Sequence, residues 1–404
     1  MTVRLAGLLE ARHAPIWAGA GLACLLLAPA LLGEGSYSLH ILMTVFIFAT
    51  LGHAWNLMAG YAGLLTFGQQ VFIGIGGFAQ ALFHYYGSVS IWAAWPLSGL
   101  ASLAFAWLLC LPIGGRGGRR RMWLGIGIAI LLALGYEAVI AIDPLADVFG
   151  SVYVRRIVIL LLLFLGALPL LRLRGAYFAI ATWLIAESVS TVFNGWNVAG
   201  AGGGMQIKTE VTQLQLYYAA LALLAVTTAI IWAWMRSTAG LALTAIRDDE
   251  DVAQTCGVDI GAVKATVFLF SAVATGLAAG LYFIDVVIIT PPSAFTISWA
   301  AYTVFIVVSG GMGTVAGPIV GAVLFIIIER LLGAIVGQGM LLLGALSILL
   351  MLILPQGVIG LVSDFRRRRP PAASTLALNA AESFDTEPPD HALAPPVSKT
   401  GPAI

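Results

Sequence analysis

Side chains that could do chemistry are few in this chain, and they are scattered. The five histidines form no His-x-x-x-His pair, and no Gly-x-Ser-x-Gly nucleophile elbow occurs. None of the three lysines follows a glycine, so the sequence contains no Walker A loop. Cys24, Cys110 and Cys256 lie far apart, which supports neither a zinc site nor a disulfide framework. The sequence therefore predicts no catalytic residues, no metal and no ATP site in this chain.

Acidic residues inside apolar stretches are the remaining candidates for chemistry. A carboxylate within a membrane span is costly and by default marks a functional site. Glu187 is the clearest case, and Glu137, Asp285 and Glu329 are weaker ones. Two interpretations of Glu187 stay open: a role in transport, or a structural hydrogen bond. Glu187 or Asp285 could also be the ion-coupled carboxylate of a secondary transporter.

One glycine motif imitates a cofactor site. Residues 311–316, Gly-Met-Gly-Thr-Val-Ala, fit the G-x-G-x-x-A pattern of dinucleotide sites. That motif needs a preceding strand and an acid about 20 residues later, but here it lies between apolar stretches and Glu329 comes too soon. Small residues at four-residue spacing instead allow two helix backbones to approach closely. We predict such helix contacts at Gly313, Gly317 and Gly321, and at Ala272, Gly276 and Gly280.

The elements that must position these residues are membrane helices. Hydrophobic residues make up 60% of the chain, charged residues only 10%, and the mean hydropathy is +0.98. A soluble domain carries about 25% charged residues. The formal net charge is +1, and no long basic patch with interleaved aromatic residues suggests nucleic acid. Composition therefore predicts an all-α polytopic membrane protein and excludes soluble globular folds.

Apolar runs of about 20 residues mark the spans. They predict about 10–12 transmembrane helices, near residues 16–33, 39–58, 64–85, 91–113, 122–142, 157–171, 175–194, 214–235, 262–288, 298–312, 315–333 and 339–361. Only glycines separate 298–312 from 315–333, so one of these two is expected to be broken or re-entrant. The first run could alternatively be a cleaved signal peptide that ends near Ala30.

Sidedness follows from the distribution of lysine and arginine in the short loops. With the N-terminus inside, most of these residues fall on the cytoplasmic side, and the pair Arg155–Arg156 is the clear exception. Both termini are therefore predicted to be cytoplasmic. Residues 1–365 form the transmembrane domain. Residues 366–404 are rich in proline and poor in aromatic residues, which predicts a disordered cytoplasmic tail.

The longest polar segment between spans, residues 236–264, faces the cytoplasm in this arrangement. Asp248 can cap a helix of about two turns, and Gly257 can close it. Its apolar and small residues, Val252, Ala253 and Cys256, are able to pack. Two interpretations remain: a solvated loop that links two spans, or a docking helix that takes force from a cytoplasmic partner.

Glycines interrupt residues 56–78 more than any ordinary span tolerates. Irregular backbone at membrane depth occurs only where protein or a water-filled cavity covers it. Polar residues here and in residues 172–187 are therefore candidates to line a translocation pathway: Asn56, Thr66, Gln69 and Gln70, and Tyr177, Thr182 and Glu187. Alternatively, the glycines serve tight packing, and the glutamines form hydrogen bonds between helices.

Three segments, 56–83, 172–207 and 236–332, resemble the permeases of branched-chain amino-acid ABC importers, specifically the LivM type. The matching residues are Gly60-Tyr-Ala-Gly63, Phe67-Gly-Gln, Gly74-Ile-Gly76, Arg172-Leu-Arg-Gly-Ala-Tyr-Phe-Ala-Ile-Ala-Thr182, Ala186-Glu187, Ala239-Gly240, Ala245-Ile-Arg247, Glu250, Ala253, Gly257-Val-Asp259, Gly310-Gly-Met-Gly-Thr-Val-Ala-Gly-Pro318 and Gly321-Ala322. Their order and spacing agree over most of the chain.

The resemblance implies a transport subunit of the bacterial inner membrane rather than an enzyme. Such a permease pairs with a second, homologous permease, two ATP-binding subunits dock below, and a periplasmic binding protein delivers the substrate. ATP would then bind only to the partner subunits. The cytoplasmic loop would be a coupling helix against an ATPase subunit, through Ala245, Ile246, Arg247, Asp249, Glu250, Ala253 and Gly257.

Some residues depart from the family's pattern. The family often has histidine where this chain has Gln69, and Gly-Ala-Tyr where it has Gly76-Gly-Phe78. Residues 114–160 intervene as an insertion of two helices. Glycine-rich versions also resemble the urea-transport permeases, so a permease for urea or short amides is an alternative. An ion-coupled secondary transporter is favoured less, and a membrane-embedded enzyme least.

Overall fold

The computed structural model describes residues 23–33, 35–87, 89–110, 175–200, 202–207, 211–335 and 357–361, with Gly21 and Gly344. The spans expected at 122–142 and 157–171, the insertion 114–160 with Glu137, the tail 366–404 and most of 339–361 lie outside these residues. The chain divides into two compact units, Met1–Gly360 and Leu361–Ile404. Every labelled helix and strand belongs to the first unit.

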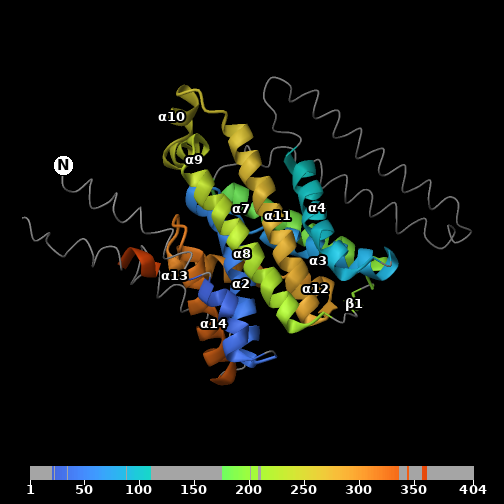
Figure 1. Ribbon diagram of the computed structural model, residues 1–404. Helices are drawn as coiled ribbons and strands as arrows, with labels where there is room; N and C mark the ends of the chain where they lie inside the picture. The colour runs from blue at the N-terminus through green and yellow to red at the C-terminus, as the bar shows by residue number, and fades with distance from the viewer. Residues whose placement is uncertain are drawn as a thin grey trace, which may run out of the picture. The chain divides into compact units, whose positions relative to one another are not determined.

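Helices dominate the described part of the first unit (Figure 1). In chain order they are α2 (Tyr37–Asn56), the π-helical turn η1 (Leu57–Tyr61), α3 (Gln69–Gly87), α4 (Ile91–Cys110), α7 (Ala176–Asn194), the 3-10 turn η4 (Asn197–Ala199), α8 (Gln213–Met235), α9 (Thr238–Asp248), α10 (Glu250–Thr255), α11 (Ile260–Val286), α12 (Pro291–Ala294), α13 (Ser298–Gly310) and α14 (Gly317–Ile335). A shorter apolar helix covers Ala23–Leu32.

Six helical segments of the described residues are long and apolar enough to cross a membrane. They are Tyr37–Tyr61, Ile91–Cys110, Ala176–Asn194, Gln213–Met235, Ile260–Val286 and Pro291–Gly310. The prediction of an all-α polytopic membrane protein is confirmed. A single short strand pair accompanies the described helices: β1 (Met205–Gln206) runs antiparallel to β2 (Ile288–Ile289).

Several of these helices begin where a side chain satisfies a free backbone N–H. The Ser36 hydroxyl accepts from Leu39 N at the start of α2, and Asp259 accepts from Ala262 N at the start of α11 (3.0 Å). Thr212 and Gln215 form a capping box at the start of α8. These caps mark the ends of apolar stretches that run for most of a membrane thickness.

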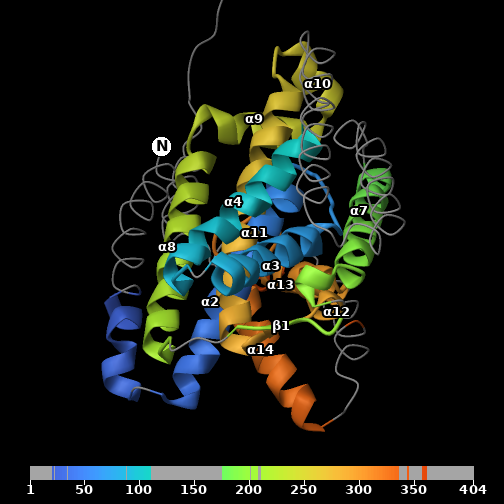
Figure 2. The same ribbon diagram turned by 90° about the vertical axis from the view of Figure 1, so that its right-hand side faces the viewer.

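The helix α2 lies inside the bundle, in contact with α8, α11, α13 and α14 (Figure 2). Every residue from Met43 to Asn56 is buried. A helix that is apolar all round is expected in such an interior position. It then passes into η1 and an irregular stretch that lasts until Gln69. The span predicted at 64–85 therefore starts later, because the glycine-rich residues before it are not helical.

Both of the runs predicted around the glycines 310–313 are helical. α13 and α14 form a hairpin, and the turn between them covers residues 311–316. A Cβ atom at Gly310 would lie 2.7 Å from the carbonyl carbon of Gly317, and one at Gly321 would lie 2.7 Å from that of Ile306. The hairpin can therefore close this tightly only with glycine at these positions.

A second glycine contact joins α3, α4 and α11. A Cβ atom at Gly76 would lie 2.7 Å from Gly276 Cα, and one at Gly276 would lie 2.7 Å from Ser102 Cβ. Gly280 faces the side chains of Gln80 and Ser98 in the same seam. The structure thus places Gly276 and Gly280 at close helix contacts. Because no hydrophobic driving force brings helices together in lipid, close van der Waals packing between small residues stabilises such contacts.

The described connections divide between two ends of the bundle. α9 and α10 connect the last residues of α8 to the first residues of α11. The strands β1 and β2, with η4 and α12, lie at the other end of α11 (Figure 2). The sidedness predicted from the basic residues would put α9 and α10 in the cytoplasm.

Gly276→Ala is expected to lower the stability of the protein by about 1–3 kcal/mol, because the added methyl group overpacks the seam between α4 and α11. The measurement is the melting temperature of the detergent-purified protein. Gly21→Ala is the control, since no atom outside its own helix backbone and chain neighbours lies within 4 Å of the Cβ position there. Equal melting temperatures for Gly276→Ala and the control would contradict the tight seam.

Candidate functional site

The polar segment 236–264 folds into two helices, α9 and α10, rather than the single short helix expected. Asp248 is the last residue of α9, and it is Asp249 that caps α10. The Asp249 carboxylate accepts from Asp251 N (2.8 Å) and Val252 N (3.0 Å). The cap prediction at Asp248 was wrong because only Asp249 has the extended backbone that an N-cap needs. Gly257, with φ +86°, follows α10 and allows the chain to turn back.

The short helix α10 buries one face only. Ala253 is buried, whereas Val252 and Cys256 are exposed and do not pack against the described residues of this chain. The predicted coupling residues divide accordingly. Ala245, Asp249 and Gly257 are not buried, and Ile246 is buried. The remaining two, Arg247 and Glu250, have partners inside the protein.

Glu250 forms an ion pair with Lys264 at the start of α11. The Lys264 side chain is only 2% exposed, so this pair fastens α10 to the transmembrane domain from within. From the sequence, Lys264 is one of the loop lysines and arginines that indicate the cytoplasmic side. A lysine at the start of an otherwise apolar run was the available signal, because a buried lysine requires a carboxylate partner.

Arg247 reaches from α9 to the end of the buried helix α2. Its Nη1 donates to the carbonyl oxygen of Gly60 in η1 (3.1 Å). Its Nε and Nη2 lie 3.4 Å from Asp248 Oδ1. A guanidinium at this position satisfies a carbonyl that the end of a helix leaves without a partner.

Asn56, predicted as a pathway residue, lies at the same place and is 1% exposed. Its Oδ1 accepts from Gly313 N (2.8 Å), and its Nδ2 donates to Thr314 O (2.9 Å). The side chain therefore holds the turn between α13 and α14 against η1. We call Asn56, Gly60, Arg247, Gly313 and Thr314 the break joint.

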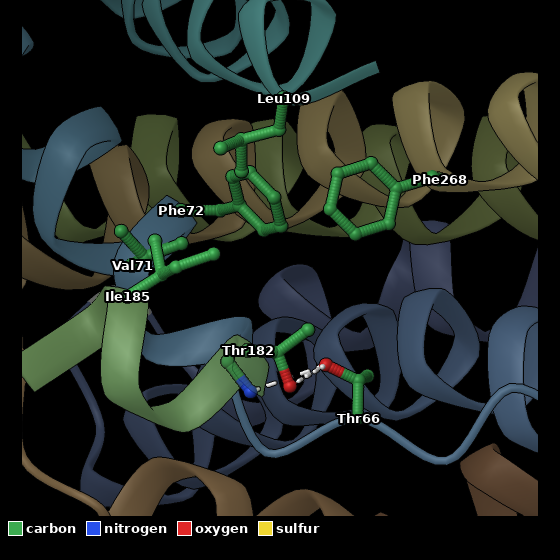
Figure 3. A pocket seen from close by; sticks show the side chains of 8 residues that line it. Thr66, Val71, Phe72, Leu109, Thr182, Ile185 and Phe268 are labelled. Atoms are coloured by element: carbon green, nitrogen blue, oxygen red, sulfur yellow. Dashed lines mark hydrogen bonds between the residues drawn. The ribbon is translucent and has the colours of Figure 1, made fainter. Parts of the chain in front are cut away.

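Two further pathway candidates, Thr66 and Thr182, meet at a small pocket (Figure 3). Thr66 Oγ1 donates to Thr182 Oγ1 (3.2 Å), and Thr182 Oγ1 donates to Ala179 O (2.8 Å). The labelled apolar side chains come from α3, α4, α7 and α11: Val71, Phe72, Leu109, Ile185 and Phe268. Only about 10 Å³ is open to a molecule the size of water. The pocket is thus closed to an amino acid in this conformation.

The other pathway candidates are dispersed. Gln69 donates to Leu51 O and to Thr275 Oγ1, each at 3.0 Å, and so bonds α3 to two neighbouring helices. Gln70 is fully buried, and its amide has no hydrogen-bond partner among the described residues. Tyr177 and Glu187 are exposed on α7 with respect to the described residues.

The carboxylate of Asp285 has a partner that the sequence did not indicate. His40 Nε2 of α2 lies 3.1 Å from Asp285 Oδ2 of α11. The pair sits toward the end of α11 away from α9 and α10. Among the described residues, no group of three histidine, cysteine, aspartate or glutamate residues could hold a metal ion.

Lys264→Met is expected to destabilise the docking of α10 by about 1–3 kcal/mol, because it removes a charged hydrogen-bond donor of the partly buried Glu250 carboxylate. Limited proteolysis of residues 249–257 measures this, with faster cleavage expected. The double variant Lys264→Met/Glu250→Gln removes both charges and should recover much of the protection. Cleavage as slow in Lys264→Met as in the unaltered protein would contradict the role of the pair.

Comparison with known proteins places the chain among membrane permeases. Residues 117–355, more than half of the chain, match the family model for the permease component of branched-chain amino acid transport systems. The high-affinity branched-chain amino acid transport system permease protein LivM of Salmonella typhimurium is 28% identical over 333 residues, 82% of this chain and 71% of that protein. LivM of Escherichia coli is 27% identical over the same shares. No solved structure matches the chain.

The resemblance inferred from the motifs is therefore confirmed. A chain of this kind is a transport subunit that works with other components, and it is not itself an enzyme. It belongs to the permease family of branched-chain amino acid transport systems, as the multi-pass membrane subunit of an amino acid ABC importer.

Proposed function

We propose that this permease imports branched-chain amino acids across a bacterial inner membrane, driven by ATP hydrolysis on partner subunits. It would pair with a second, homologous permease, two ATP-binding subunits would dock below the pair, one of them on α9 and α10, and a periplasmic binding protein would deliver the substrate. ATP would be bound by the partners alone, since the sequence has no Walker A loop. Both termini would then be cytoplasmic.

The observation that carries this proposal is the surface of α9 and α10. Leu241 is 70% exposed and Val252 is 57% exposed, although both lie in a polar segment at the end of the bundle. Exposed apolar side chains ringed by polar residues are typical of protein interfaces. The acidic residues that surround Val252 supply such a rim.

We take the pocket at Thr66 and Thr182, which is closed in this conformation, as a part of the proposed pathway that would admit an apolar substrate once widened. Its walls are aliphatic and aromatic, which suits a branched aliphatic side chain and offers few partners to the polar groups of urea. Both LivM relatives are named as transporters of branched-chain amino acids. We therefore prefer branched-chain amino acids to urea or short amides as the substrate.

The mechanism would use the ends of α8 and α11. ATP binding would close the ATP-binding subunits and move α9 and α10, and this movement would tilt the two long helices that they connect. Glycine contacts such as Gly76 against Gly276 allow packed helices to slide. The closed pocket beside α7 would open in one of the two resulting states.

An ion-coupled secondary transporter finds less support. Neither of its candidate carboxylates lines the pocket: Asp285 is paired with His40, and Glu187 is exposed with respect to the described helices. Uptake that survives ATP depletion and collapses with an ionophore would favour it over the ATP-driven importer.

Val252→Asp is expected to reduce co-purification of the ATP-binding subunit by about tenfold or more, because it places a charge in the proposed interface. Quantitative immunoblotting of the tagged, gently solubilised complex measures the loss. Val198→Asp is the matched control, because Val198 is also exposed but lies in η4, at the opposite end of the bundle. Equal loss in both variants would argue against docking at α10. Charge reversal at Asp249 or Glu250 is a poorer test, since these residues cap α10 and anchor it.

Uptake of labelled leucine by the reconstituted transporter should be inhibited by excess unlabelled isoleucine and valine, and it should be unaffected by the same excess of urea. The reason is that an apolar pocket suits the aliphatic side chain that the three amino acids share. Direct uptake of labelled urea, without competition by leucine, would instead favour the amide permease.

A further inference from the structure

The break joint connects three segments that are distant in the sequence. Asn56 and Gly60 end the α2 region, Arg247 belongs to α9, and Gly313 and Thr314 belong to the turn between α13 and α14. The hydrogen bond of Arg247 with Gly60 links α9 directly to η1, at the end of the interior helix α2. This link matters because α9 carries part of the proposed docking surface.

The first half of the joint is a helix end. The chain leaves helical geometry after Tyr61, so the last carbonyl oxygens of η1 lack partners of their own helix. Leu64 N takes one of them, Met58 O (2.8 Å), and the Arg247 guanidinium takes another, Gly60 O (3.1 Å). A positive charge is favourable at the carboxyl end of a helix. Arg247 is thus a cap for η1 supplied by α9.

The second half of the joint is a tight turn. Gly313 has φ +74°, a conformation that other residues rarely adopt. The Asn56 amide bonds both Gly313 N and Thr314 O and so fixes this turn from both sides. Movement of η1 must therefore carry the turn, and with it the near ends of α13 and α14.

The three segments approach one another closely, although the Arg247 side chain remains 43% exposed. A Cβ atom at Gly60 would lie 2.7 Å from Gly313 N, one at Gly63 would lie 3.3 Å from Arg247 Cγ, and one at Gly313 would lie 3.3 Å from Arg247 Nη1. Backbone and guanidinium are thus in close contact. A displacement of α9 would therefore act on η1 and on the turn through these contacts.

A separate contact holds α10 against the transmembrane helices. The ion pair of Glu250 with Lys264 holds α10 against α11, the helix that follows it in the chain. The ion pair connects the docking surface to α11, and the Arg247 hydrogen bond connects it to η1 and the buried helix α2. These two polar contacts add to the buried residues Leu243, Ile246 and Ala253 and to the chain itself, which joins α9 to α8 and α10 to α11.

We propose that Arg247 and Asn56 are positioning residues that transmit the movement of α9 to the two helix breaks, so that ATP hydrolysis on the partners opens and closes the pathway. This inference rests on the proposed ATP-driven import. It predicts that loss of the Arg247 contact leaves the partners bound and hydrolysing ATP, while transport is lost.

The test uses the complete transporter reconstituted in liposomes, with three measurements: bound ATP-binding subunit, ATP hydrolysis rate and uptake of labelled leucine. Arg247→Gln should keep the first two near the unaltered values and reduce leucine taken up per ATP by about tenfold or more, as expected when a hydrogen bond from a charged group is lost. Arg247→Lys should recover part of this ratio, because an ammonium can still reach Gly60 O.

Arg236→Gln is the matched control. Arg236 is another arginine at the same end of the bundle, and it stacks on Trp232 of α8 instead of entering the joint. Its uptake per ATP should equal that of the unaltered transporter. Asn56→Asp tests the second half of the joint, because it keeps the acceptor for Gly313 N and loses the donor to Thr314 O; a reduced ratio is expected.

The outcomes separate the inference from the proposed function. If the unaltered complex shows no ATP-dependent uptake, the proposed function is wrong. If that complex is coupled and Arg247→Gln is equally coupled, only the joint is overturned. Parallel loss of subunit binding and uptake in Arg247→Gln would also overturn it, in favour of a docking role. Should Arg247→Gln fail to reach the membrane, Asn56→Asp decides, because it removes the donor to Thr314 O, and an unaltered ratio there overturns the proposal.

Discussion

Backbone polar groups at membrane depth must find partners within the protein, and much of this structure follows from that constraint. The chain breaks helical geometry between Tyr61 and Gln69, and again between α13 and α14. Each break has dedicated side chains. Trp55 Nε1 donates to Thr66 O (2.8 Å), and Thr66 Oγ1 accepts from Gly68 N (3.1 Å). In the break joint, the side chains that satisfy the breaks also tie them to each other and to α9.

Three polar systems of the described residues are separate in space and in role. The break joint lies at the end of the bundle near α9, the threonine pocket lies between α3, α4, α7 and α11, and the pair His40–Asp285 lies toward the other end of α11. An alternating-access transporter needs structure at both ends and a closable space between them. The described residues provide polar contacts near both ends of α11, and Thr66 and Thr182 bond to each other at the narrow pocket between them.

Six of the expected spans correspond to helices of the described residues that are long and apolar enough to cross a membrane. They could be located from the sequence because an apolar run of helix length is the main requirement for crossing a bilayer. Irregular backbone could be expected within residues 56–78, since repeated glycine does not favour a helix, but its bounds could not, because α3 is helical from Gln69. Hydrogen bonds between residues far apart in the sequence could not be predicted. Asn56 looked like a pathway residue because no local pattern reveals that its partner, Gly313, comes 257 residues later. The exposure of Val252 could not be predicted either, because a helix of about two turns is too short for its hydrophobic periodicity to indicate the buried face.

The break joint also has a consequence for biogenesis. Gly60 and Arg247 are 187 residues apart in the chain, and a ribosome adds about 5–20 residues per second. The interior helix is therefore synthesised roughly 10–40 seconds before its cap has been made. During that interval the Gly60 carbonyl lacks the Arg247 donor that it has in the folded protein. A nascent chain that stalls before α9 would remain in this incomplete state, and the interior helix can reach its final form only after Gly313 and Thr314 have also been translated.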